Sequence, residues 1–166
     1  MAHSDNPHDQ EPRRRLGCVT VLDRGDTGAV LFVKTTYRDE LILPGGAAHA
    51  GESITLAAAR ELREETGLRM EPTHFLALDQ VPENEQTGAN EGLNVVIDGG
   101  TLSAKEADAL SIPAKALKEI EALVWVRPRD FDELAPYQAR RVRQALDARA
   151  SDRRLPLLFF GEPVAS

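Results

Sequence analysis

Two apolar runs near the start of the chain have the composition of β-strands. The first covers residues 17–23 (GCVTVLD), and the second covers residues 28–36 (GAVLFVKTT). β-branched and aromatic residues favour strands, and the intervening RGDT is typical of a turn. The pattern therefore predicts a β-hairpin. A short apolar step at residues 41–43 follows, and it leads into the turn-forming PGG.

The spacing of the apolar residues becomes helical after this turn. Residues 54–66 are good helix formers, Ser53 is placed to cap the first turn, and Gly67 is placed to end the helix. We therefore expect one helix over residues 54–66, preceded by a loop that begins at the PGG turn.

The rest of the chain predicts three further strands and a second long helix. The strands are expected at residues 74–81, 93–97 and 120–126. Residues 137–149 have the pattern of an amphipathic helix, and residues 131–134 resemble a short helical turn. Residues 102–118 are ambiguous, because a proline interrupts an otherwise helical composition. Strands on both sides of a central helix, with a helix near the end, predict an α/β domain with a mixed sheet.

Length and composition predict a single domain. The chain has 166 residues, of which 42% are hydrophobic, and this suffices for one well-formed core. Residues 1–15 are polar, contain proline and lack a pattern, so we expect them to be a disordered lead before a domain at residues 16–166. Cys18 is the only cysteine, which excludes an internal disulfide and a cysteine metal cluster. Its apolar surroundings predict a buried thiol.

Charge and hydropathy exclude several classes of protein. The formal net charge of −7 argues against general nucleic-acid binding, but it does not exclude a small phosphorylated ligand. A membrane-spanning helix needs about 18 consecutive apolar residues or more, and the sequence contains no such run. It also lacks the apolar segment of a signal peptide. These features predict a cytoplasmic protein that does not bind membranes.

Several aromatic and basic residues could have either a structural role or a role in binding a ligand. Phe32, Phe75 and Trp125 lie in strand-like runs and are expected in the core rather than as platforms for stacked bases. Tyr37 is the more plausible exposed aromatic, with an ordinary residue at the edge of the hairpin as the alternative. The arginines of the last helix are expected to form a solvated face, with phosphate or partner contact as the alternative. They are Arg140, Arg141 and Arg143.

Three carboxylates of the helix at residues 54–66 emerge on one side. At about 100° per residue, Glu61, Glu64 and Glu65 fall within an arc of about 100°. Like charges at this spacing repel by about 0.2–0.5 kcal/mol per pair, and a purely solvated helix gains nothing from that arrangement. A divalent cation such as Mg²⁺ or Mn²⁺ would reverse the sign of this interaction. Arg60 is four residues before Glu64 and can pair with it.

The same stretch resembles the signature box of the Nudix hydrolase family. That box reads Gly, five residues, Glu, seven residues, then Arg-Glu-apolar-any-Glu-Glu-any-Gly-apolar. The specified positions are filled by Gly46, Glu52, Arg60, Glu61, Leu62, Glu64, Glu65, Gly67 and Leu68. One departure is His49, where members often carry an acidic residue, and we expect a surface histidine there. The resemblance implies an α/β/α sandwich around a mixed sheet.

The resemblance also implies roles for individual residues. Glu61, Glu64 and Glu65 match the carboxylates that bind divalent metal, Mg²⁺ or Mn²⁺, and the backbone carbonyl of Gly45 matches a further ligand. Glu61 matches the carboxylate that also acts as the base in several members of the family. Glu64 is expected with it among the catalytic residues. Arg60 matches the arginine that orients these side chains. The first glutamate of the box, at position 52, is expected to support the loop.

The implied activity is hydrolysis of a phosphoanhydride bond. The substrate would be a small nucleoside diphosphate linked to another group, attacked at phosphorus by metal-activated water. The base is left open between Glu61 and an acid of the loop that precedes the strand at 93–97. Glu83, Glu85 and Glu91 are the acids of that loop, and one of them would be the base or an additional metal ligand. Glu91 is preferred because it begins the next strand, with a solvated loop acid as the alternative.

Two alternatives from other classes stay open. One is a noncatalytic module of the Nudix fold that senses a nucleotide, and the other is an interaction protein whose acidic helix is only a surface. An intact box argues against the sensor, and the carboxylate spacing argues against the plain surface. The sequence does not name the substrate or the number of metal ions, and it leaves a homodimer open.

Overall fold

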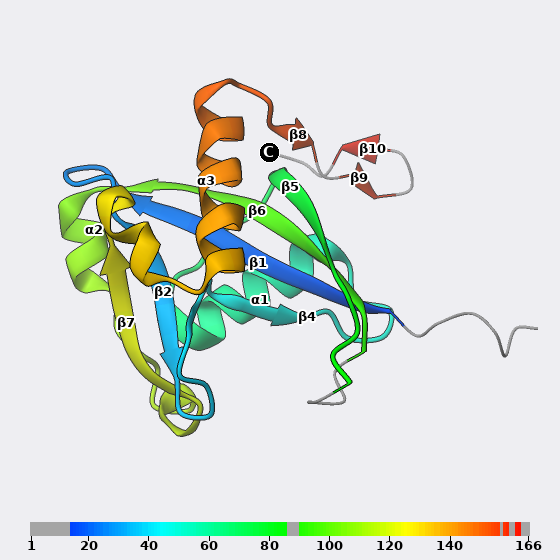
Figure 1. Cartoon of the computed structure of the whole chain (residues 1–166), viewed down its shortest axis with the longest axis horizontal. Helices are drawn as coiled ribbons and strands as arrows, with labels where there is room; N and C mark the ends of the chain where they lie inside the picture. Colours follow the sequence, from blue (N-terminus) through cyan, green and yellow to red (C-terminus); the bar gives the residue numbers. More distant parts are fainter. Residues whose placement is uncertain (1–13, 86–89, 157, 160–161, 164–166) are drawn as a thin grey trace, which may run out of the picture.

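A mixed β-sheet forms the centre of the protein (Figure 1). The structure is a computed structural model that describes residues 14–85, 90–156, 158–159 and 162–163. The strands pair in the order β3-β2-β1-β6-β5-β8, with β4 also beside β1 and β7 beside β2. The eight strands are β1 (Arg15–Arg24), β2 (Val30–Thr35), β3 (Leu41–Ile42), β4 (Gly45–Ala47), β5 (His74–Val81), β6 (Gly92–Leu102), β7 (Ile120–Val126) and β8 (Leu155–Pro156). β1 and β6 are parallel, and the other pairs are antiparallel.

Helices cover both faces of this sheet. They are α1 (Ile54–Thr66), α2 (Ala104–Ala109) and α3 (Pro136–Ala150), with short 3-10 segments η2 (Ala116–Lys118) and η3 (Pro128–Glu133). In Figure 1, α3 crosses in front of β1 and α1 lies behind it. A small separate pair is formed by β9 (Leu158–Phe159) and β10 (Glu162–Pro163). The architecture confirms the predicted α/β class with a mixed sheet.

The side chains of β1 alternate between two core layers. Val21 points toward α3, where it shares a buried cluster with Phe32, Val96, Val142 and Ala145. All five are fully buried. Because each large side chain contributes about 1.5–3 kcal/mol when it leaves water, this layer is what holds α3 on the sheet.

The other layer joins the sheet to α1. Cys18 packs there with Val95 and Ile97 of β6 and with Ala57 and Ala58 of α1. The alanine side chains are short, so the helix backbone lies close to the strands. The buried Cys18 confirms the prediction for that residue, and burial raises the pKa of its thiol to about 11, with nearby glutamates adding to the effect. It is therefore a neutral packing group.

The predicted hairpin and the predicted first helix are confirmed. β1 and β2 pair antiparallel through Asp23 and Val30. The Ser53 side chain accepts a hydrogen bond from the backbone N–H of Leu56 at the start of α1. Gly67 ends the helix with a φ of 74°, a left-handed conformation that glycine adopts without strain.

Several boundaries differ from the expectation. β1 begins at Arg15, which pairs with Gly92, so the end of the expected disordered lead belongs to the sheet; residues 1–13 lie outside the described residues. The ambiguous 102–118 segment contains α2, which Ser103 and Glu106 start with a reciprocal capping box. β6 extends to Leu102 because it follows β1 along its whole length.

One prediction for the last helix is wrong. Arg140 and Arg143 are exposed, but Arg141 is buried among neighbours. Its guanidinium donates to Asp79 of β5 over 2.6 Å and to Gln138 over 3.2 Å. A paired and buried guanidinium cannot form part of a solvated face, and its charge is already balanced by Asp79.

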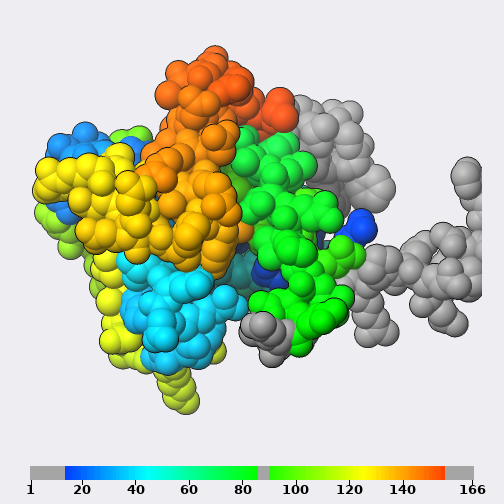
Figure 2. Space-filling model, viewed as in Figure 1, coloured from blue at the N-terminus to red at the C-terminus, as the bar shows by residue number. Residues whose placement is uncertain are grey.

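The surface is hollowed where three parts of the chain meet: β5, α3 and the segment that precedes β4 (Figure 2). The tyrosine at the start of α3, Tyr137, donates to Glu40 over 2.8 Å and lies beside the Arg141 guanidinium. Together with the pair of Arg141 and Asp79, this contact joins three segments that are distant in sequence.

In the part of the chain that the structure describes, none of the helices has the length and apolar character needed to cross a bilayer.

Candidate active site

Two adjacent glycines bring the backbone of β4 close to α1. Gly46 pairs with Cys18 and Gly45 pairs with Val19, so both lie against the middle of β1. Gly45 has a φ of 136°, and a Cβ there would collide with the Cys18 carbonyl oxygen. A Cβ on Gly46 would stand 2.5–2.7 Å from the carboxylate atoms of Glu61. The site therefore requires glycine at both positions, for different reasons.

Glu65 is held beside this turn. Its Oε2 accepts a hydrogen bond of 2.7 Å from the backbone N–H of Gly45. Burial raises the pKa of Glu65 to about 8, the hydrogen bond from Gly45 opposes that rise, and the like charges of Glu61, Glu119 and Glu64 reinforce it. Without a nearby cation, this carboxyl group keeps its proton at neutral pH.

Arg60 lies at the centre of the acidic cluster. Its Nε and Nη2 donate to the two carboxylate oxygens of Glu52, each over 2.8 Å, and Nη1 donates to Glu61 over 2.7 Å. Nη2 also donates to the carbonyl of Ala47. The expected contact with Glu64 is present but longer, at 3.3 Å. Arg60 thus fixes two carboxylates firmly and the third weakly.

Glu52 has a supporting position, as the resemblance implied. The hydrogen bonds from Arg60 hold its pKa at about 2, well below the usual range, and the backbone N–H of His49 contributes to the same effect. His49 itself is exposed, which confirms the surface histidine. Glu52 is therefore an anion at every working pH, and it ties the 47–52 loop to α1 through Arg60.

The donor set fits a hard divalent cation. Three carboxylates, from Glu52, Glu61 and Glu64, contact the single guanidinium of Arg60, and a fourth, from Glu65, is held by the backbone N–H of Gly45. An excess of negative charge on oxygen ligands is the chemistry that Mg²⁺ and Mn²⁺ prefer. The described residues contain no group of three acidic, histidine or cysteine side chains already arranged as a metal site. The carboxylates are instead separated by their contacts with Arg60 and Gly45.

Sequence reasoning missed Glu119. This exposed residue lies directly before β7, and its negative charge is one of those that raise the pKa of Glu65. Its backbone carbonyl accepts from the N–H of Thr36, which fixes the end of the strand beside β2. The only signal in the sequence was an acid at the boundary of an apolar run, and that signal does not say which face of the fold it reaches.

The acids of the 82–91 loop are placed differently. The Glu91 carboxylate forms an ion pair of 2.9 Å with Arg14. Glu83 and Glu85 are exposed, and residues 86–89 lie outside the described residues. No hydrogen bond or ion pair joins any of the three to the box carboxylates within the described ranges. A role for Glu91 as the base stays a prediction.

The raised pKa of Glu65 predicts an unusual dependence of stability on pH. In the unfolded chain this carboxyl group ionises near 4.5, whereas in the fold it keeps its proton up to about 8. Its contribution is therefore fully present below pH 4.5 and is lost as the pH rises through 8. In chelator, we expect the free energy of unfolding to fall by an amount on the order of 3 kcal/mol over this window.

Urea unfolding at several pH values between 5 and 8 measures this effect. Glu65→Gln cannot ionise, so its unfolding free energy is expected to vary less with pH than that of the parent. Glu71→Gln, which changes an exposed acid just after α1, serves as the matched control and should keep the parent slope. Equal slopes for the parent and Glu65→Gln would contradict the assignment.

Comparisons with known proteins agree with the fold and with the box. The family described as "NUDIX domain" matches residues 11–147. Phosphatase NudJ of Escherichia coli K12 is 24% identical over 154 residues, which cover 92% of each chain. The MutT protein of Methanosarcina mazei Go1 is a similar solved structure, with a TM-score of 0.65 and 19% identity over 86% of this chain and 98% of that one. The NUDIX domain of Shewanella oneidensis NrtR, solved with ADP ribose, has a TM-score of 0.65 and 17% identity over 89% and 98%.

Proposed function

The chain belongs to the NUDIX family, and from that premise we propose that it is a divalent-metal-dependent hydrolase of nucleoside diphosphate derivatives. Membership makes it a Nudix pyrophosphohydrolase. The observation that supports the metal dependence is the cluster of Glu61, Glu64 and Glu65 on one side of α1. One of its members, Glu65, has a pKa near 8 because it is buried and lies near the like charges of Glu61, Glu119 and Glu64, and a bound dication would favour its ionised form.

The proposed ligands come from two elements. Glu61, Glu64 and Glu65 on α1 would hold the cation together with the backbone carbonyl of Gly45 on β4. A bound Mg²⁺ or Mn²⁺ would neutralise the diphosphate oxygens and lower the pKa of a water molecule. Hard carboxylate oxygens that leave some positions open for phosphate suit this purpose.

The residues of the chain supply positioning and proton transfer. The oxygen of water forms a bond to phosphorus while the bridging P–O bond breaks, and a carboxylate accepts the proton of the water. We assign this role to Glu61, whose carboxylate lies against Gly46 and is oriented by Arg60 over 2.7 Å. Arg60 is thus a positioning residue. Glu52 in turn holds Arg60 by two hydrogen bonds.

Our proposal for the substrate class rests on a similar solved structure and on the shape of the surface. The NrtR domain binds ADP ribose in its solved structure, a nucleoside diphosphate joined to another group. In this chain, the surface is hollowed between β5, α3 and the segment before β4 (Figure 2), and we propose that such a ligand lies there. We propose a small nucleotide derivative as the substrate; a cytoplasmic location and a homodimer stay predictions.

A turnover assay tests the proposal. The purified protein would be incubated with nucleoside triphosphates, ADP-ribose, nucleotide sugars and dinucleoside polyphosphates, in Mg²⁺, in Mn²⁺ and in chelator. We expect phosphate or nucleotide release from at least one diphosphate compound, present with metal and absent with chelator. Binding of such a compound without turnover in any metal would favour the noncatalytic sensor, and chelator-resistant turnover would contradict the metal requirement.

A further inference from the structure

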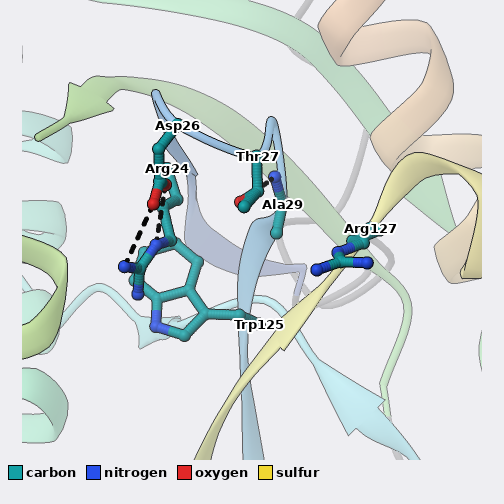
Figure 3. Close-up of a pocket in the computed structure, with 6 residues that line it drawn as sticks. All are labelled: Arg24, Asp26, Thr27, Ala29, Trp125 and Arg127. Atoms are coloured by element: carbon teal, nitrogen blue, oxygen red, sulfur yellow. Dashed lines mark hydrogen bonds and ion pairs between the residues drawn. The ribbon is translucent and has the colours of Figure 1, made fainter. Parts of the chain in front are cut away.

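A second cavity lies at the opposite end of β1 from the box. The turn between β1 and β2 and the end of β7 enclose a volume of ≈ 320 Å³, which we call the hairpin pocket (Figure 3). Its lining residues are Arg24, Asp26, Thr27, Ala29, Trp125 and Arg127. An adjoining depression of ≈ 300 Å³ shares Thr27 and Arg127 and adds Pro128 and Arg129. Each of these two volumes, taken singly, is at the lower end of the range for small-ligand sites.

The hairpin pocket has an aromatic wall that the core holds in place. Trp125 pairs with Leu31 across β2 and β7, and it packs against the buried cluster that contains Leu22 and Leu62. The residue is only partly buried, although its neighbours in that cluster are fully buried. We expected Trp125 to be a core residue, but part of its indole lines a pocket. A fixed, accessible indole can stack a planar ring.

The two ends of the hairpin pocket differ in charge. At one end, Arg24 donates to Asp26 over 2.8 Å and to Asp108 over 2.7 Å, so two carboxylates balance one guanidinium. Both carboxylate oxygens of Asp26 accept from Arg24, the second over 3.2 Å, so that end carries no free positive charge, and a ligand donor would share an oxygen that Arg24 already binds. Figure 3 shows Asp26 above the indole, the Arg24 side chain overlapping the indole in this view, Thr27 and Ala29 in the middle, and Arg127 at the far side.

Arg127 is the cationic end. Its side chain is exposed, and among the described residues no carboxylate or carbonyl pairs with its guanidinium. Arg129 lies in the adjoining depression and meets only Asp130, at 3.5 Å on the surface. The Thr27 hydroxyl accepts from the backbone N–H of Ala29 and also hydrogen-bonds the Asp26 side chain, so Arg127 and Arg129 are the groups left to meet an anion. These groups suit an anion with several oxygens.

We propose that the hairpin pocket binds a nucleoside phosphate outside the catalytic site. The base would stack on Trp125, an amino group of the base would donate to Asp26, and the phosphate would meet Arg127. Along β1, five residues separate Val19, which pairs with Gly45, from Arg24, a distance of about 16 Å. The pocket is therefore separate from the box, and the proposal does not rest on the hydrolase activity.

The chain provides its own reporter for this pocket. Trp125 is the only tryptophan, so tryptophan fluorescence arises at the proposed site alone. We expect AMP to quench it saturably, in chelator as well as in Mg²⁺, and to bind more tightly than adenosine or inorganic phosphate. Arg127→Ala should weaken AMP binding by about ten-fold or more, and Arg127→Lys should recover part of that loss.

Catalytic-site variants separate this pocket from the box. Glu64→Gln is expected to leave the AMP titration unchanged, and Arg127→Ala is expected to leave turnover unchanged. Because Arg127 is exposed, its replacement does not endanger the fold, which circular dichroism would verify. The proposal is overturned if AMP produces no saturable quenching, if quenching persists unaltered in Arg127→Ala, or if Glu64→Gln removes it.

Discussion

Glu64→Gln is expected to lower kcat by a factor on the order of 10³ while leaving the fold intact. The Glu64 side chain is 53% exposed, and its one contact within the described residues is the 3.3 Å pair with Arg60. The fold therefore gains little from this carboxylate. Glutamine keeps the shape and removes the charge, so it weakens a ligand for a dication without opening a cavity. The same change relieves repulsion from Glu61 and Glu65, which favours the helix by a few tenths of a kcal/mol.

The comparison with an exposed acid outside the cluster isolates this effect. Steady-state rates at saturating metal and substrate would be measured for the parent, for Glu64→Gln and for Glu71→Gln, together with urea unfolding of each. Glu71→Gln makes the same chemical change just beyond α1 and should keep the parent rate. The assignment fails if Glu64→Gln retains parent turnover with parent stability. A lost rate with a lost fold would instead indicate that Glu64 supports the structure.

Sequence alone predicted what local chemistry controls. α1 could be placed because Ser53 and Gly67 mark its ends, and these caps act on neighbouring backbone groups. The hairpin and the two-faced core follow from alternating side chains in β1 and β2. The spacing of three glutamates fixed their common direction on α1 before any tertiary contact was known.

Contacts between distant segments were beyond such reasoning. Arg60 was expected to pair with Glu64, one helical turn away, but its shorter hydrogen bonds are to Glu52 and Glu61. Glu119 reaches the site only because β7 pairs with β2. Arg141 looked solvated because its neighbours are charged, and its burial depends on Asp79 from β5. The positions of Glu119 and Arg141 depend on strand pairing, and the contact of Arg60 with Glu52 depends on the path of the loop before α1; no local pattern encodes either.

Replacing either glycine of the PGG turn by alanine is expected to affect a different property: mainly stability at Gly45 and mainly the reaction rate at Gly46. Gly45→Ala places a side chain on a residue with a φ of 136°, and the new Cβ would collide with the backbone of Cys18. Backbone cannot rotate aside, so β4 must move away from β1. We expect a loss of about 3 kcal/mol or more in the free energy of unfolding.

Gly46→Ala meets a different obstacle. Its backbone is not left-handed, and the nearest atoms to the new Cβ would be those of the Glu61 carboxylate, the end of a flexible side chain that can swing away. The expected stability cost is therefore about 1 kcal/mol. The displaced Glu61 carboxylate would lose its contact with Arg60 and the position from which it accepts the proton of the attacking water. A misplacement of about 1 Å at a reacting group lowers the rate by a factor on the order of 10².

Measuring both properties in both variants tests how the site is built. Urea unfolding should separate Gly45→Ala from the parent and leave Gly46→Ala close to it, whereas kcat of Gly46→Ala should fall in a protein that remains folded. Gly51→Ala is the matched control, because Gly51 also has a positive φ of 77° but its Cβ would meet nothing. It should show only the cost of backbone strain. Parent activity in Gly46→Ala would mean that the reaction does not depend on the position of the Glu61 carboxylate against this backbone. Another acid would then have to be the base.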